Sequence, residues 1–345
     1  MLNKIKVNIK NNYIELLFVS IVFIIASFLR FNNLSELTTF NADQEWLAYR
    51  AKDILQKDIV LIGPVTSVGN YSIGPIFVYM WAFFSFISNN APIAGALLSV
   101  TIGLFSLLMI YFFIRYFFDK KVAIIVMFLL AISAPTIFWD QSPWTPSLFI
   151  VAQILLLLGG YLSINNKLGY LIISLSLVIG FQSHVGIVLS LISLCVFFLF
   201  VKPIKPDYVT ILKSSVIMFI GFLPNIVFDL THNFVNFYRI FDVLKGENLD
   251  YFVGIGKIIN VLSYNSVSIL YPLKESTLDV ILLRILFALV LVNAFRNLRN
   301  YRFKKLSWLL ITTGLIPALF FYIQQGKFSE YYLMMTVPRI KNKAA

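Results

Sequence analysis

The sequence predicts an all-α polytopic membrane protein with about nine transmembrane helices. Of its 345 residues, 59% are hydrophobic and 13% are charged, whereas soluble domains are about 45–50% apolar and about 25% charged. The mean hydropathy is +0.84, and the 34 phenylalanines exceed what one compact core of this size could hold. Lipid must therefore cover much of the surface.

Long apolar segments recur along the whole chain. A spanning helix needs about 20 mainly apolar residues. The segments that approach this length are 14–30, 93–115, 121–138, 147–163, 168–183, 185–201, 210–228, 278–295 and 306–323. They predict a single membrane-embedded domain over residues 1–345.

The charged residues predict the orientation of these spans. With the N-terminus inside, the inner segments hold fifteen Lys and Arg residues and three acidic ones, against nine basic and thirteen acidic residues outside. This bias follows the positive-inside rule. We therefore expect a multi-pass protein of the inner (cytoplasmic) membrane with a cytoplasmic N-terminus. The dispersed basic residues form no stripe for nucleic acid, and the single Cys195 excludes a disulfide framework.

Two predicted outer loops are long, at residues 31–92 and 229–277. Within the first, residues 75–88 are apolar but too short to cross a bilayer, so we expect an interfacial or re-entrant helix there. Long ordered loops are usually functional. The outer loops are therefore where a site is expected.

The stretch 40–55 of the first outer loop carries two acids at a predicted helix start. Apolar residues recur at helical spacing, which predicts an amphipathic helix lying on the membrane. Asn41 is the expected N-cap, which places Asp43 and Glu45 in the first turn. An ionised Asp43 at the water interface could act as a general base. Alternatively, both acids only complement the helix dipole.

An Asp followed by an acid and an amphipathic helix, just after the first span, resembles the first outer loop of GT-C-fold glycosyltransferases. The resemblance is to the bacterial branch that includes protein O-mannosyltransferases, aminoarabinose transferases and RgtA/B/C/D-like proteins. In that family this Asp is the catalytic carboxylate, and Asp43 occupies the matching position. The glycine- and proline-containing turn 69–75 and the aromatic segment 76–88 look like the element that follows it.

The connection 138–147 resembles the family's second outer loop, which often contains Arg-x-x-Trp-Asn-Pro or Asp-Pro. It departs from that pattern, because Gln141 stands near the expected Arg and Thr145 at the Asn or Asp. Asp140 is near enough to supply a supporting carboxylate. The alternative for this stretch is an interfacial aromatic belt with a helix start.

Three further residues are candidates for the site. His184 lies in a Gln-x-His turn like one that faces the cavity in the family, where it could move a proton or, when charged, bind a phosphate; a structural role is the alternative. Lys327, followed by Tyr and Pro, matches a basic residue that contacts the phosphate of the lipid donor in relatives, or it anchors a span end by snorkelling. Arg284 lies inside the eighth predicted span, where a charge is costly; it binds the carrier phosphate or snorkels outward.

The resemblance implies transfer of a sugar from a polyprenyl-phosphate donor to a hydroxyl of a glycan, lipid or protein acceptor on the outer face. Asp43 would be the base, and Lys327 with Arg284 or His184 would offset charge on the leaving phosphate. A divalent cation, if the reaction uses one, would be held by Glu45 or Asp140. Relatives continue past the Lys327 region, so the C-terminal part of the family architecture is expected to be missing.

Two other classes stay open at the level of the sequence. One is a lipid-linked sugar flippase or transporter, against which the almost wholly apolar spans and the lack of a visible repeat argue. The other is a catalytically inert membrane protein, which the altered second-loop motif keeps open.

Overall fold

The computed structural model describes residues 13–66, 70–89 and 92–245, with short pieces between 292 and 312. The described chain is helical apart from an isolated antiparallel bridge between Val65 and Ser72. The elements are α1 (Tyr13–Phe31), α2 (Leu34–Leu37), α3 (Ala42–Leu55), α4 (Ile76–Ile87), α5 (Ala94–Phe117), α6 (Lys120–Ala131), α7 (Ala134–Gln141), α8 (Ser147–Leu162), α9 (Leu168–Phe181), α10 (Ile187–Val201), α11 (Tyr208–Thr231) and α12 (Val235–Lys245).

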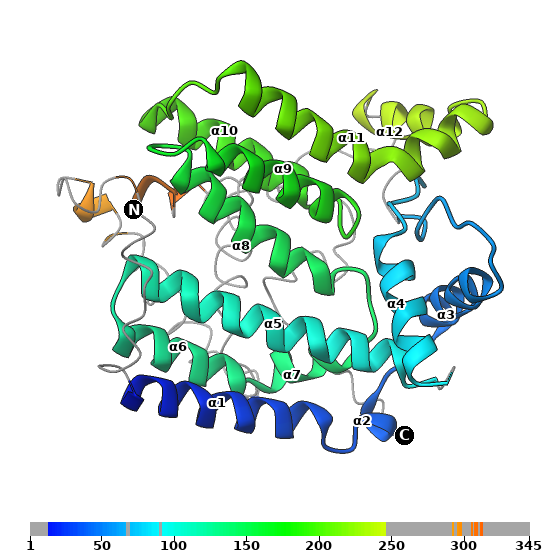
Figure 1. The fold of residues 1–345 in the computed structure, drawn as a ribbon, viewed down its shortest axis with the longest axis horizontal. Helices are drawn as coiled ribbons and strands as arrows, with labels where there is room; N and C mark the ends of the chain where they lie inside the picture. The colour runs from blue at the N-terminus through cyan, green and yellow to red at the C-terminus, as the bar shows by residue number, and fades with distance from the viewer. Residues whose placement is uncertain are drawn as a thin grey trace, which may run out of the picture.

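The long helices run back and forth in one bundle (Figure 1), with α1, α5 and α6 on one side and α8 to α11 on the other. Three described helices, α1, α5 and α11, are long and apolar enough to cross a membrane, and α4, α8, α9 and α10 are shorter apolar helices. The predicted class, a helical membrane protein, agrees with this architecture. The predicted spans 278–295 and 306–323 lie largely outside the described residues, so the number of nine spans stays a prediction.

The predicted span 121–138 is broken into two helices. Helix α6 begins at the N-cap Asp119, whose side chain accepts hydrogen bonds from Lys121 N and Val122 N, and ends at Ala131. Helix α7 restarts at Ala134, with Pro135 in its first turn. Proline has no N–H to donate to the carbonyl four residues earlier. Two helices therefore stand where the sequence predicted one spanning segment, and the break leaves the Ala131 carbonyl needing another donor.

In the part of the chain that the structure describes, the buried apolar side chains form three clusters, and α5 contributes to two of them. The first cluster joins α3, α4, α5 and α8 and includes Leu47, Phe77, Trp81, Leu98 and Val151. The second joins α1, α5 and α6 around Val22, Ala26, Val100 and Met127. The third joins α8, α9 and α10 around Ala152, Ile173 and Phe197.

The apolar stripe of α3 faces protein. We predicted that α3 lies on the membrane, but Leu47 and Ala51 are buried against α4 and α5. Helix α4 packs tightly on α5, since Gly95 lies so close to the Trp81 ring that a side chain there would clash. Because lipid and protein interior are equally apolar, the sequence pattern could not distinguish the two environments.

Alternate connections gather at opposite ends of the bundle. One end, which we call the α3 end, carries α2, α3, α4 and α12 and the connections after α7, α9 and α11 (Figure 1). The start of α5 is also there, since Ser99 in its second turn lies 3.5 Å from Ser147 of α8, oxygen to oxygen. Helix α4 therefore lies at the α3 end between α3 and the start of α5 (Figure 1), and its interfacial or re-entrant placement stays a prediction. Which end faces the cytoplasm stays a prediction.

Candidate functional site

The candidate catalytic residue Asp43 lies in the first turn of α3, at the α3 end. The extended backbone of Asn41 makes it the N-cap, and its side-chain oxygen accepts a hydrogen bond from Asp43 N at 3.0 Å. In return Asn41 N donates to Gln44 Oε1 at 3.0 Å, which completes a capping box. The predicted cap is therefore confirmed, and the side chains of Asp43 and Glu45 are exposed.

Two contacts join this turn to the connection between α7 and α8. Gln44 Nε2 donates to the carbonyl oxygen of Pro143 at 3.1 Å, and Gln44 is buried. Just before the cap, Thr39 Oγ1 donates to Ser142 Oγ at 3.3 Å. The first predicted outer loop is thus fixed to the connection that resembles the family's second outer loop, although about 100 residues separate them.

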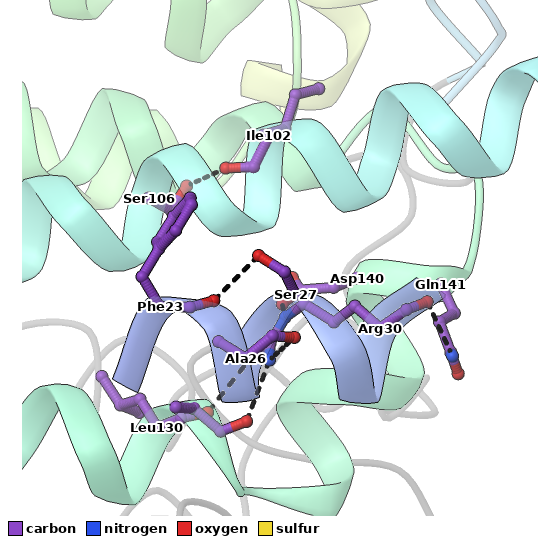
Figure 2. A network of polar contacts seen from close by, with 10 residues as sticks. Phe23, Ala26, Ser27, Arg30, Ile102, Ser106, Leu130, Asp140 and Gln141 are labelled. Atoms are coloured by element: carbon purple, nitrogen blue, oxygen red, sulfur yellow. Dashed lines mark hydrogen bonds and ion pairs between the residues drawn. The ribbon is translucent and has the colours of Figure 1, made fainter. Parts of the chain in front are cut away.

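A buried ion pair joins α1 to α7, the helix that precedes this connection (Figure 2). Arg30, near the end of α1, is fully buried, and its Nε lies 2.7 Å from Asp140 Oδ2 on α7. Arg30 Nη1 also donates to the Ala131 carbonyl at 2.9 Å, the acceptor that the break before Pro135 left without a helical partner. The arginine therefore joins α1 to both sides of the α6–α7 break.

The neighbouring Gln141 of α7 contacts the backbone of α1 in return. Its Nε2 donates to the carbonyl oxygen of Arg30 at 3.1 Å, at the end of α1 where helical carbonyls lose their partners (Figure 2). Gly103 of α5 lies so close to the Asp140 carboxylate that a side chain would clash. We call Arg30, Asp140 and Gln141 the buried junction.

The junction bears on the roles predicted for Asp140. Its carboxylate is buried and accepts from Arg30, so it supports the site by joining helices rather than by facing solvent. No three His, Cys, Asp or Glu side chains cluster as a metal site in the part of the chain that the structure describes. A divalent cation held by Glu45 or Asp140 stays a prediction.

The predicted Gln-x-His turn lies between α9 and α10 at the same end. Gln182 Oε1 accepts from Ile76 N at 3.2 Å, at the start of α4, and its Nε2 donates to the Gly221 carbonyl of α11 at 2.9 Å. Gly74 leaves the space that the Gln182 side chain fills. Gln182 thus ties three helices together.

His184 lies beside that link, with its ring against Phe149. Its Nδ1 accepts from Gly186 N at 2.9 Å, so the neutral ring carries its proton on Nε2. Burial lowers the pKa of His184 to about 4. The ring is neutral at pH 7, which disfavours its predicted role as a cation beside a phosphate and leaves it a hydrogen-bonding role.

The start of the second long predicted loop (229–277) is hydrogen-bonded to the first one (31–92). Asn236 of α12 exchanges two hydrogen bonds with the backbone of Ser72, at 2.6 and 2.9 Å, and Asp229 Oδ1 accepts from Asn236 N at 2.9 Å. Arg239 Nη1 donates to the Asn70 carbonyl at 2.9 Å. The predicted donor-phosphate residues Arg284 and Lys327 lie outside the described residues.

Sequence reasoning missed the part played by Arg30. It treated this residue only as a boundary charge, although an arginine inside the end of an apolar span needs a buried partner. That expectation combined with the nearby acid in 138–147 could have indicated the pair.

Comparison of the chain with known protein families, with curated proteins and with solved structures gives no match in any of the three. Fold and site define the class as a helical membrane protein with a polar junction at one end.

Proposed function

We propose that the protein is a membrane glycosyltransferase that transfers a sugar from a polyprenyl-phosphate donor to an acceptor hydroxyl on the outer face of the cytoplasmic membrane. The observation that carries the proposal is the placement of Asp43. Its carboxylate is exposed at the start of a capped helix, and that helix is held against the connection between α7 and α8. The resemblance of both segments to the GT-C family supplies the reaction.

In the proposed reaction Asp43 accepts the proton of the acceptor hydroxyl as the oxygen attacks the anomeric carbon. The new glycosidic bond forms while the bond from that carbon to the phosphate oxygen breaks, and the lipid phosphate leaves with the electron pair. The configuration at the anomeric carbon is inverted. The reaction uses Asp43 as a carboxylate, which is the form that a base needs.

Glu45, in the same turn, would orient the acceptor, and Lys327 and Arg284 would offset charge on the leaving phosphate. His184, neutral at pH 7, would contribute a hydrogen bond. Asp140 would act through the buried junction, which fixes the connection to which Gln44, next to Asp43, is hydrogen-bonded.

The test compares wild type with Asp43→Asn in proteoliposomes, measuring transfer of labelled sugar from a panel of polyprenyl-phosphate sugars to cell-envelope extract. Because a general base typically contributes 10²–10⁴-fold, we expect the rate to fall by about that factor with donor binding retained. Asp58→Asn, the same change at an exposed position just after α3, is the matched control and should leave the rate unchanged.

Equal transfer by wild type and Asp43→Asn would contradict the role of Asp43 and leave the acid as helix capping. No transfer by wild type from any donor of the panel would contradict the proposed function and favour the inert or transporting alternatives.

A further inference from the structure

The side-chain amide of Gln44 makes two hydrogen bonds, one within the cap of α3 and one to the distant α7–α8 connection. Its Oε1 accepts from Asn41 N within the capping box, and its Nε2 donates to the Pro143 carbonyl in the connection between α7 and α8. It is buried, whereas its neighbours Asp43 and Glu45 are exposed. One amide therefore determines both how α3 begins and where that beginning lies against the α7–α8 connection.

The partner of Gln44 is itself fixed. The connection that carries Pro143 follows α7 directly, and α7 is held by the Arg30–Asp140 ion pair and by the Gln141 contact to α1. An anchor to a segment with these contacts limits movement of the anchored turn. A side chain whose amide has both a donor and an acceptor in use also has little freedom to reorient.

We infer that Gln44 is a positioning residue, which sets the place of the Asp43 carboxylate by anchoring the first turn of α3 to the Pro143 carbonyl. The inference rests on the proposed function for its effect on rate, and on the contacts alone for the anchor. A misplacement of about 1 Å at a reacting group can cost about 10²-fold in rate. Gln44 itself touches neither donor nor acceptor in this assignment.

Substitution by Glu separates the two contacts of Gln44. Gln44→Glu keeps an oxygen for Asn41 N but places an oxygen against the Pro143 carbonyl, so the cap survives and the anchor is lost. Gln44→Met removes both contacts without adding a charge beside Asp43. We expect both variants to lose about 10- to 10²-fold in kcat with the donor KM unchanged. The matched controls are Gln56→Glu and Gln56→Met at the exposed C-cap of α3.

A crosslink gives a readout that does not depend on transfer. The side-chain oxygens of Thr39 and Ser142 are 3.3 Å apart, so we choose these two positions for a cysteine pair, in a protein whose own Cys195 is replaced by Ala. In membranes, the Thr39→Cys/Ser142→Cys protein should form the bridge quickly. Adding Gln44→Glu should slow bridge formation by about tenfold or more, while Gln56→Glu should not.

The same bridge also tests the positioning role by rescue. Once formed in the Gln44→Glu protein, it replaces the lost anchor and should restore most of the transfer rate. An unchanged rate of bridge formation in Gln44→Glu would overturn the anchor. Slower bridge formation without rescue, in a protein whose wild type is active, would overturn the positioning role. An inactive wild type would overturn the proposed function, and the crosslinking rate would still decide the anchor.

Discussion

The two ends of the bundle are held together by different kinds of contact. At the α3 end, backbone groups of distant segments are bound by the side-chain amides of Gln44, Gln141, Gln182 and Asn236. The buried Arg30–Asp140 pair lies at the same end, and an exposed pair, Arg50–Asp53, lies within α3. At the opposite end, charged side chains pair with one another. Lys167, just before α9, pairs there with Asp207, just before α11, and the distance from Lys167 Nζ to Asp207 Oδ2 is 2.8 Å.

The opposite end also contains a second, partly buried pair. Arg115, near the end of α5, donates to Glu15 in the first turn of α1, with Nη2 at 3.0 Å from Oε2. Tyr111 donates to the same carboxylate. These charges lie where the positive-inside rule predicts an excess of basic residues.

The contrast teaches what each end is suited for. Amide contacts to backbone have a fixed geometry and do not depend on ionisation in the physiological range. Exposed ion pairs are weakened by salt and hold long side chains only loosely. Precise placement, which the proposed site needs, is therefore found at the α3 end, and the following predictions test this difference from its largest to its smallest effect.

The largest effect is expected from Arg30→Met. The substitution leaves the Asp140 carboxylate buried without its cation and the Ala131 carbonyl without its donor. Removing one partner of a buried pair typically costs about 3–5 kcal/mol of unfolding free energy. Denaturant unfolding of the purified protein in detergent measures this loss, with Arg50→Met, which removes an exposed arginine of α3, as the matched control.

The double variant Arg30→Met/Asp140→Asn sharpens this result. With the buried charge removed as well, the loss should be smaller than for Arg30→Met alone, which a double-mutant cycle shows as coupling. Strictly additive losses would mean that the two side chains do not act as a pair.

The second effect is a pH dependence caused by His184. Its folded-state pKa of about 4 lies below the ordinary value of 6.5, so the unfolded state binds the proton first as the pH falls. Stability is therefore fully present above about pH 6.5 and lost as the pH falls towards 4, by up to about 3 kcal/mol. Unfolding measured from pH 7 to pH 4.5 should show this loss.

His184→Asn provides the comparison, since an Asn oxygen can still accept from Gly186 N. The variant should lose less stability than wild type across that pH range, whatever its stability at pH 7. His232→Asn, at an exposed histidine, is the matched control and should keep the wild-type slope. The same slope in His184→Asn and wild type would show that this ring does not titrate with unfolding.

The parts that could be predicted from sequence were local. Hydropathy predicts the helical membrane class, and the Asn41 cap was recognised because a cap involves only residues two or three apart. The α6–α7 break was missed although Pro135 signalled it. A proline at this position is compatible with the end of one helix and also with the first turn of a new one. The Arg30–Asp140 pair joins residues 110 positions apart, and one sequence does not show which distant segments meet.

The smallest effect is expected at the opposite end of the bundle, from Lys167→Met. Both side chains of the Lys167–Asp207 pair are substantially exposed. Asp207 also caps α11 by accepting from Thr210 N at 2.9 Å, so the cap survives the loss of the lysine. Exposed pairs contribute little, and we expect Tm to fall by at most about 2 °C at low salt. At about 1 M salt, where the Debye length falls to about 3 Å, the difference should shrink. A fall as large as that of Arg30→Met, or one that does not shrink in high salt, would contradict the assignment of the Lys167–Asp207 pair as a weak, exposed contact.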